Sequence, residues 1–329
     1  MQNKIDTGDI SFVFQGPVAH RGGNLVANVR STKKTFPDAE YLLSTWEGAD
    51  ESVFCHFDKV ILNKDPGPIL IDPVTGYPNN ILRQVVSTAN GLKAASSRYA
   101  VKIRTDFSVA NAGFIDHWSA FTPTNPEMLC FSKPVAIISL GCNDPLRTTG
   151  LFHCSDFFYF GLKEDLLLYW DVEEQVRNEK NRTLSILEKI LHPLYGLTFS
   201  RLAIEQELFR DFIQKKYNAQ FEMNFRDEFS KELLSLSENL LLNNFVLLEA
   251  AEAGVVVPER ISKLSKLDHH YIPAEVATIA GGSESNFQSR YIRSKFIRYK
   301  RMPRQVLLTA YSIVSYLLNR LFAKHAHDK

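Results

Sequence analysis

One acidic residue, Asp106, follows two cationic residues, Lys102 and Arg104, at the end of a short apolar segment. A carboxylate in such a place can supply hard oxygen ligands to a divalent cation that bridges two phosphates. The neighbouring cationic side chains can stabilise the same negative charge directly. The triplet therefore makes this segment a candidate phosphate site. A surface carboxylate that caps the following segment is the alternative.

The segment before this triplet repeats polar residues at a spacing of three and four, which places them on one face of a helix. These residues are Asn80, Arg83, Gln84, Ser87, Asn90 and Gly91. A glycine inside a helix costs about 1 kcal/mol relative to alanine, so a close approach by a ligand or another backbone is expected at Gly91. An ordinary solvated helix face is the competing interpretation.

Two other segments carry side chains suited to a nucleotide. Gln15, Gly16 and Pro17 follow a buried apolar segment, and Ser44 and Trp46 follow another. Gly16 allows close backbone approach, Gln15 can read the edge of a base, and Trp46 offers a stacking surface. Taken singly, a turn glycine and a core tryptophan are commoner.

Two carboxylates are candidates for a general base. Asp156 precedes an aromatic segment and can deprotonate a hydroxyl within hydrogen-bond reach, and Glu205 is the second candidate. The competing interpretations are a turn aspartate and an exposed helical glutamate. His153 fits a structural role better than a metal ligand, since no second histidine stands at ligand spacing.

Composition bounds the class of protein. The chain has 329 residues, 45% of them apolar, which suits a single large α/β domain with appended helices. A formal net charge of +1 argues against a general nucleic-acid binder. The cysteines show no CxxC pair, so reduced thiols in the cytoplasm fit best. The N-terminal residues carry no apolar signal region.

The elements that must position these residues alternate between strands and helices. We expect strands at Ile10–Phe14, Ala39–Ser44, Lys59–Asn63 and Tyr99–Ile103, and helices at Asn24–Phe36 and Asn79–Ser97. Alternation at this spacing predicts a mainly parallel sheet, whose ligands bind outside the carboxyl ends of the strands. The candidate nucleotide residues would then share one edge.

The second half of the chain has a different pattern. Short strands are expected at Glu127–Phe131, Val135–Leu140 and Phe157–Phe160, helices at Asp165–Leu191 and Phe229–Ala253, and a loop at Ala280–Gln288. The predicted organisation is a catalytic domain over 1–230, with a nucleotide half at 8–110 and an acceptor half at 111–230. Flanking helices and a linker follow at 231–289, and a C-terminal extension at 290–329.

The C-terminal extension combines charge with apolar surface. Residues Arg290 to Arg304 include many Lys and Arg and no acidic residue, and Gln305 to Ala323 form an amphipathic helix pattern. Such a helix can lie in a bilayer interface, which predicts a peripheral protein on the cytoplasmic face of the inner membrane. Packing onto the protein itself, or against a second subunit in an oligomer, is the alternative.

Several segments together resemble the WavE-type lipopolysaccharide synthesis family over residues 10 to 170. They are ISFVFQGPV, FPDAEYLLSTWEG, ILNKDPG, RQVVSTANGL, KIRTD and SDFFYFGLKEDL. The resemblance implies an α/β GT-A-like glycosyltransferase with a mainly parallel sheet flanked by helices. It implies a nucleotide-sugar donor and a lipid-linked or oligosaccharide acceptor of lipopolysaccharide core, O antigen or capsule.

Carried over residue by residue, the resemblance places a set of side chains near donor and acceptor: Gln15, Gly16, Arg83, Ser87, Lys102, Arg104, Asp106, Ser155 and Asp156. The GT-A fold normally has Asp-x-Asp where this chain has Arg104, Thr105 and Asp106. Asp106 is therefore expected to help hold the leaving diphosphate, alone or through Mn²⁺ or Mg²⁺, and metal dependence stays open.

Two other functions fit parts of the pattern. A nucleotidyltransferase that makes activated sugars would use a similar sheet, but it needs a Gly-rich basic loop after the first strand. Residues Gln15 to Gly23 supply only Arg21, Gly22 and Gly23 in a loose arrangement. A non-catalytic, membrane-recruited assembly partner that keeps the fold is the second alternative.

Overall fold

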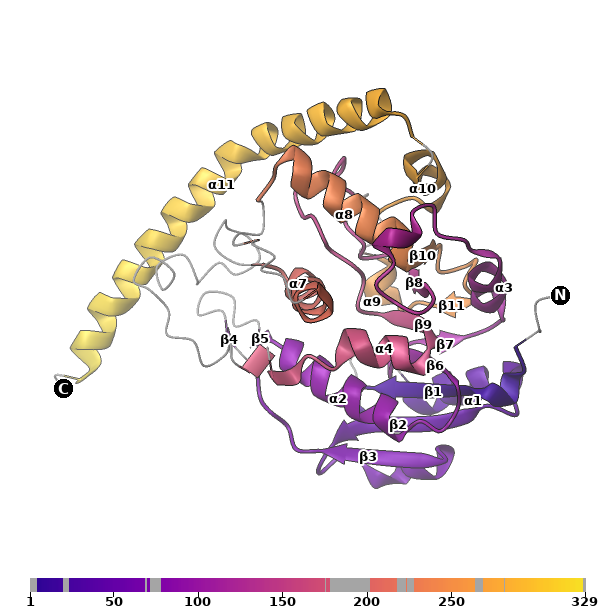
Figure 1. The fold of residues 1–329 in the computed structure, drawn as a ribbon. Helices are drawn as coiled ribbons and strands as arrows, with labels where there is room; N and C mark the ends of the chain where they lie inside the picture. Colours follow the sequence, from indigo (N-terminus) through magenta and orange to yellow (C-terminus); the bar gives the residue numbers. More distant parts are fainter. Residues whose placement is uncertain are drawn as a thin grey trace.

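A mixed, mainly parallel sheet forms the centre of the protein. The structure is a computed structural model and describes residues 5–19, 24–68, 70–71, 78–174, 176–177, 202–217, 223, 228–263, 269–280 and 282–327. Within these ranges the main sheet has seven strands in the order β10-β8-β9-β6-β1-β2-β3 (Figure 1). They are β1 (Ile10–Gln15), β2 (Glu40–Trp46), β3 (Lys59–Asn63), β6 (Tyr99–Arg104), β8 (Val135–Ile138), β9 (Phe158–Leu162) and β10 (Phe245–Leu248).

Only β9 runs antiparallel to its neighbours, β6 and β8; the other pairings are parallel. Two small antiparallel pairs in the described part of the chain lie outside this sheet. They join β4 (Leu70–Ile71) to β5 (Pro78–Asn79), and β7 (Ser108–Val109) to β11 (Val255–Val256).

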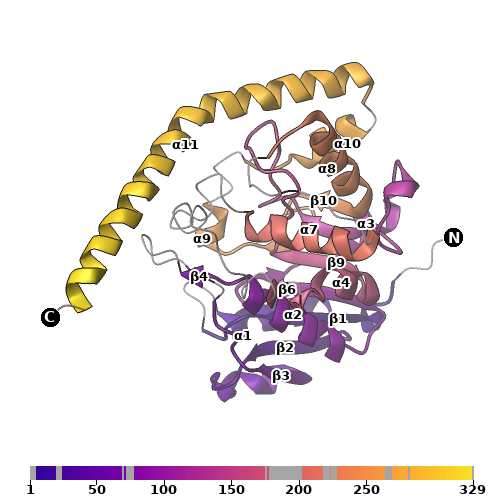
Figure 2. The ribbon, with the colours of Figure 1, turned by 60° about the vertical axis from the view of Figure 1, so that its left-hand side comes forward.

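Helices cover both faces of the sheet. Apolar residues of α2 (Ile81–Ala94), α4 (Lys163–Trp170), α7 (Ile204–Tyr217) and α8 (Lys231–Asn244) share one buried cluster. Those of α1 (Leu25–Thr35), α3 (Gly113–Ala120) and α9 (Glu259–Ser262) share the other. Helices α2, α4 and α7 lie in front of the sheet in Figure 2. Side chains of β1 enter both clusters: Phe12 and Phe14 belong to one and Val13 to the other. The whole strand is therefore buried, as expected for a parallel sheet covered by helices on both faces.

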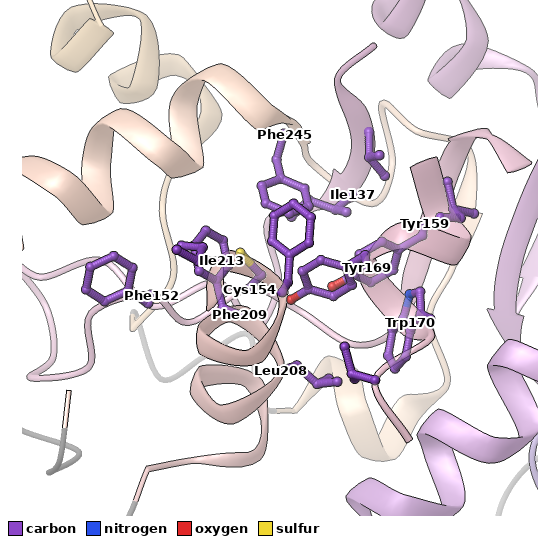
Figure 3. Packing of buried hydrophobic residues seen from close by; sticks show 14 of the residues in the cluster. Ile137, Phe152, Cys154, Tyr159, Tyr169, Trp170, Leu208, Phe209, Ile213 and Phe245 are labelled. Carbon is purple, nitrogen blue, oxygen red and sulfur yellow. The ribbon is translucent and has the colours of Figure 1, made fainter. Parts of the chain in front are cut away.

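An aromatic cluster fills the space between β9, β10, α4 and α7 (Figure 3). Tyr159 and Trp170 pack edge to face with ring centroids 5.3 Å apart, and Tyr169 and Phe245 do so at 5.8 Å. Such pairs contribute beyond their buried area. This packing holds β9 beside β6, and Asp156 lies two residues before β9.

The C-terminal helix α11 (Glu284–His327) begins after α10 (Pro273–Ala280) and extends beyond the rest of the fold (Figures 1 and 2). Its first turns contact the body through Arg290, Ser294, Arg298 and Arg301, while the apolar side chains farther along are exposed. No helix in the described ranges has both the length and the apolar character needed to cross a bilayer.

The expected architecture is confirmed: an α/β, mainly parallel sheet flanked by helices, with a helical C-terminal extension. The strand expected at Glu127–Phe131 is wrong. A short 3-10 helix, Pro126–Met128, begins there at the Asn125 cap. The Asn244 side chain then binds the N–H of Cys130 and the carbonyl of Met128, so this backbone needs no strand partner.

Three other expected elements need correction. The helix expected over Phe229–Ala253 ends at Asn244, because Phe245–Leu248 pairs with β8 as the buried strand β10. The main sheet therefore includes part of the segment predicted as flanking. The helix expected over Asp165–Leu191 has its first part as α4, which ends at Trp170, and residues 178–191 lie outside the described ranges. Most of the loop expected at Ala280–Gln288 is helical, because α11 starts at Glu284.

Candidate functional site

A cavity of about 480 Å³ lies at the carboxyl ends of β1, β2 and β6. Its volume falls within the range of about 300–1,000 Å³ typical of ligand sites. The lining brings together many residues that the sequence predicted, and it adds Asp65 and Arg260. The full set is Gln15, Gly16, Pro17, Trp46, Asp65, Asn80, Arg83, Gln84, Arg104 and Arg260.

The loop after β1 is tied to both neighbouring strands. The Gly16 N–H donates to the Ser44 carbonyl at 3.1 Å, and the Thr105 N–H donates to the Gln15 carbonyl at 3.2 Å. The Thr105 hydroxyl donates to the Pro17 carbonyl at 2.8 Å. Gly16 has φ +117°, which side chains other than glycine rarely adopt. The loop therefore presents a fixed backbone surface to the cavity.

Helix α2 supplies the second wall. Arg83 donates to both oxygens of Asp65, at 2.7 and 2.6 Å, and to Oδ1 of Asn80 at 2.9 Å. The Ser87 hydroxyl donates to Oε1 of Gln15 at 2.9 Å and so orients the carboxamide that lines the cavity. Together these contacts fix Arg83 and Gln15 before any ligand binds.

Gln84, one turn before Ser87, differs from these residues. Its Oε1 is buried and makes no hydrogen bond within the described part of the chain. A buried acceptor without a donor costs free energy, so a ligand donor that reached it from the cavity would stabilise the site.

Two arginines on the cavity lining pair with a buried carboxylate that lies beneath them. Arg104 donates from Nε to Oδ1 of Asp106 at 3.0 Å and from Nη2 to Oδ2 at 3.2 Å. Arg260, in α9, donates from Nη2 to the same Oδ2. The Asp106 side chain is 0% exposed, whereas those of Arg104 and Arg260 are 16% and 38% exposed. Both arginines line the cavity with Asp106 beneath them.

The electrostatics of the cavity lining favour an anionic ligand. Burial disfavours the charge on Arg104, but Asp156 and Asp106 outweigh that effect and raise its pKa. Three guanidinium groups and one carboxylate, Asp65, are among the lining residues. Guanidinium groups bind phosphate oxygens through paired N–H donors, so a diphosphate suits this cavity.

Several predicted site residues lie beside the cavity rather than on its lining. Ser44 is buried and accepts a hydrogen bond from Asn63 at 2.9 Å. Gly91 lies against the sheet, where an added Cβ would stand 2.4 Å from Cγ1 of Val13. The close approach expected at Gly91 is therefore made by the sheet.

Lys102 is fully buried under the end of β6. Its Nζ lies 4.5 Å from the centre of the Trp170 ring and donates to the carbonyl oxygen of Asp156. Burial lowers the pKa of Lys102 to about 7, with the charge of Asp156 opposing the shift. Lys102 thus supports the Asp156 segment from inside the protein.

The two candidate bases share one neighbourhood. Burial raises the pKa of Cys142 to about 12, and the charges of Glu205 and Asp156 both contribute. Glu205 lies 3.2 Å from Nε2 of His153, whose Nδ1 lies 2.9 Å from the Gly141 carbonyl. His153 therefore has the structural setting that the sequence favoured. Neither carboxylate lines the cavity, and their roles as bases stay predictions.

The fit of a divalent cation depends on carboxylate oxygens near the phosphate region. No group of three or more His, Cys, Asp or Glu side chains suited to a metal occurs among the described residues. Each oxygen of Asp106 accepts from a guanidinium group. Hard cations prefer oxygen ligands that are not already paired with positive charge, so this donor set does not fit the expected cation.

A second cavity of about 580 Å³ adjoins the first and shares Pro17 and Trp46 with it. Residues Asn24 to Val26 at the start of α1 and the turn Glu47–Asp50 also line it. Trp46 lines both spaces and also packs against the apolar core, so its role as a stacking surface stays a prediction.

Sequence reasoning missed Asp65 and Arg260. Asp65 lies in the loop after β3, which the sheet-edge rule predicts as a site wall together with the loops after β1, β2 and β6, but that rule does not single out the residue. Arg260 offers no such signal. Its position depends on the pairing of β11 with β7 and on the buried Ile261 in α9, both of which are long-range features.

A family profile described as WavE lipopolysaccharide synthesis matches residues 10–313 of the chain. A search of curated proteins finds no match.

Solved structures give weaker likenesses. The S. aureus TarS crystal structure aligns with 85% of this chain at 12% identity, with a TM-score of 0.34, and this chain covers 43% of that one. An active-site mutant of LgtC aligns with 81% of this chain and 98% of its own, at 10% identity and a TM-score of 0.33. TarS 1-349 in complex with UDP-GlcNAc aligns with 94% and 79%, at 11% identity and a TM-score of 0.33. At these scores the likenesses assign neither substrate nor activity to this chain.

Proposed function

The chain belongs to the WavE lipopolysaccharide synthesis family, and we propose that it is a glycosyltransferase with a nucleotide-sugar donor. The acceptor is a lipid-linked or oligosaccharide precursor of lipopolysaccharide core, O antigen or capsule. The observation that carries the proposal is the arginine-lined cavity at the carboxyl edge of the sheet. Ligands of open α/β sheets bind at this edge.

The reaction needs a base and cationic hydrogen-bond donors from the protein. An acceptor hydroxyl oxygen forms a bond to the anomeric carbon, the bond from that carbon to the diphosphate oxygen breaks, and the nucleoside diphosphate leaves with the electron pair. A base takes the hydroxyl proton. Cationic donors must stabilise the charge that develops on the diphosphate.

The two cavities offer cationic partners for the diphosphate and space for the nucleobase. Arg83, Arg104 and Arg260 suit the diphosphate, and Gln84 supplies an acceptor that lacks a donor within the described residues. The adjoining cavity beside Trp46 has room for the nucleobase. A nucleotidyltransferase is less well supported, because it needs a Gly-rich basic loop for a triphosphate, and Gln15 to Gly23 supply only Arg21, Gly22 and Gly23 in a loose arrangement.

We assign the base to Asp156 first and Glu205 second. The Asp156 charge acts on Arg104, which lines the cavity, so Asp156 is close to the donor region. Glu205 pairs with His153. A carboxylate beside the anomeric carbon can accept the acceptor's proton as the new bond forms.

Helix α11 supports a place on the inner membrane surface. Its apolar side chains Ile292, Phe296, Tyr299, Val306, Leu307, Val314 and Leu317 are each more than half exposed. Arg293, Lys295 and Lys300 accompany them. An apolar helix face with basic residues binds an anionic bilayer surface, where a lipid-linked acceptor would also lie.

Thermal stabilisation by nucleotides tests the function. A ligand that binds only the native state raises the melting temperature as its concentration increases. We expect one nucleoside diphosphate and its sugar conjugate to stabilise the full chain. When a membrane extract supplies the acceptor, we expect the enzyme to transfer the sugar from that conjugate. Binding without transfer or hydrolysis would favour the assembly-partner alternative. No stabilisation by any nucleotide would contradict the proposal.

A further inference from the structure

We propose that Arg104 and Arg260 form a guanidinium pair that holds the donor diphosphate in place of a divalent cation, and that buried Asp106 is the positioning residue that sets the pair. The inference rests on the proposed function, because the diphosphate is that of the nucleotide donor. It adds Arg260 to the site and gives Asp106 a role different from metal binding.

The order of burial points to this arrangement. Asp106 is 0% exposed, Arg104 is 16% exposed and Arg260 is 38% exposed, so the carboxylate lies below the two cations. Both arginines line the cavity, and Asp106 does not. A phosphate that entered would therefore meet guanidinium groups first.

Asp106 also fixes the geometry of the pair. Its Oδ2 accepts from both arginines, and its Oδ1 accepts from Nε of Arg104 at 3.0 Å. Arginine side chains lose rotamer freedom when they bind a ligand, so holding them in advance lowers that entropic cost. Donors that are already oriented stabilise developing charge without reorganisation.

The two arginines come from distant parts of the chain. Arg104 ends β6, while Arg260 lies in α9, which follows the strand pairing of Val255 with Val109. Ile261, next to Arg260, is buried in the core. The fold therefore brings Arg260 to the cavity by tertiary packing rather than by a mobile side chain on an open loop.

A cation at Asp106 would have to displace these contacts. Its charge would stand beside two guanidinium groups, and the described residues offer no cluster of further acidic or histidine ligands. Like charges at such distances repel strongly in a buried site. The guanidinium pair supplies the positive charge that a metal would otherwise bring.

Calorimetric titration of the full chain tests this assignment. The probes are uridine, adenosine, guanosine and cytidine diphosphates, each with excess EDTA and, separately, with MnCl₂. We expect one of them to bind with the same affinity under both conditions. Arg260→Gln should weaken that binding about tenfold, the loss expected for one charge-assisted hydrogen-bond partner. Arg260→Lys should recover part of it, since lysine keeps the charge and loses the planar fork.

Arg177→Gln is the matched control. Arg177 also pairs with a carboxylate, Glu173, but lies outside the cavity lining. Its loss should leave nucleotide affinity unchanged. Equal binding by wild type and Arg260→Gln would overturn the proposal. Because Arg260 is partly exposed, we expect this variant to fold.

Asp106→Asn distinguishes a positioning role from a metal-binding role by the direction in which nucleotide affinity changes in EDTA. If Asp106 sets the pair, the variant binds nucleoside diphosphate less tightly in EDTA, although the pocket has become more positive. Tighter or equal binding in EDTA would overturn the positioning role, and a loss seen only with MnCl₂ would make Asp106 a metal ligand. A melting temperature for each variant shows that it is folded, and Arg260→Gln decides alone if Asp106→Asn does not fold.

The same titrations distinguish this inference from the proposed function. Binding that requires MnCl₂ would overturn the guanidinium pair and leave the glycosyltransferase assignment standing. An absence of binding under both conditions, for every nucleoside diphosphate, would contradict both.

Discussion

Lys102 donates a hydrogen bond from Nζ to the carbonyl oxygen of Asp156, so a fully buried ammonium supports the segment that carries the first candidate base. The same Nζ lies over the Trp170 ring at 4.5 Å. Strand β6 thus presents Arg104 to the cavity and Lys102 to the core, two residues apart. The cationic character of this strand serves both binding and internal support.

The Lys102 contact predicts a pH-dependent stability. Burial lowers the pKa of Lys102 to about 7, below its unfolded value, so between these two values the unfolded chain binds the extra proton. The Lys102 contribution therefore becomes less unfavourable as pH rises above 7, by up to about 1.4 kcal/mol per pH unit. Urea unfolding of wild type and Lys102→Met at pH 6, 7, 8 and 9 measures it. The stability of wild type relative to Lys102→Met should increase above pH 7, and a pH-independent difference would contradict the prediction.

Substitution of the candidate bases should separate chemistry from donor binding. Asp156→Asn keeps the shape and loses the basicity, so we expect a large loss of kcat with little change in the KM for donor. Glu205→Gln is the comparison. Normal turnover by Asp156→Asn together with a large loss in Glu205→Gln would reverse the ranking of the two residues.

Gly91 should tolerate no side chain. A Cβ there would stand 2.4 Å from Cγ1 of Val13 and 3.0 Å from Cβ of Ser44, so Gly91→Ala must displace the Val13 side chain or shift α2 away from β1 and β2. Overpacking of this kind costs about 1–3 kcal/mol, which outweighs the better helix propensity of alanine. Gly8→Ala is the control, because its nearest neighbour would be 3.7 Å away. Chemical denaturation that shows Gly91→Ala as stable as wild type would refute this packing argument.

The sequence was sufficient where local pattern and sheet topology agree. Strand β3 has the predicted bounds, Lys59–Asn63, and β1 and β6 each differ by a residue at the end. The rule that parallel strands bring their carboxyl ends to one edge predicts that Gln15, Trp46 and Arg104 lie together, and all three line one cavity.

The sequence was insufficient where tertiary contacts decide. Phe245–Leu248 continues an apolar helix pattern, but pairing with β8 makes it a strand. Arg260 reaches the cavity only because β11 pairs with β7, a contact between residues far apart in the chain. Neither contact can be predicted from local composition or periodicity.

Helix α11 should attach the protein to a membrane surface through its exposed apolar side chains. The exposed apolar residues Val306, Leu307 and Val314 lie beyond the turns that contact the body, so replacing all of them with Asp should abolish flotation with anionic liposomes while leaving the melting temperature unchanged. Truncation after Gln288 should also abolish binding, but it removes Arg290, which pairs with buried Glu238 at 2.6 Å, so its effect on the fold must be measured separately.

High salt should weaken the flotation of the wild-type protein, because each Lys or Arg near an anionic surface contributes about 1 kcal/mol that salt screens. A second copy of the chain is the other occupant that this apolar face suits, and it predicts a different result. In that case the wild-type protein stays unbound to liposomes at low salt and sediments as a dimer, while the Asp variant is a monomer. This result would show that the apolar face is a subunit interface and not a membrane-binding surface.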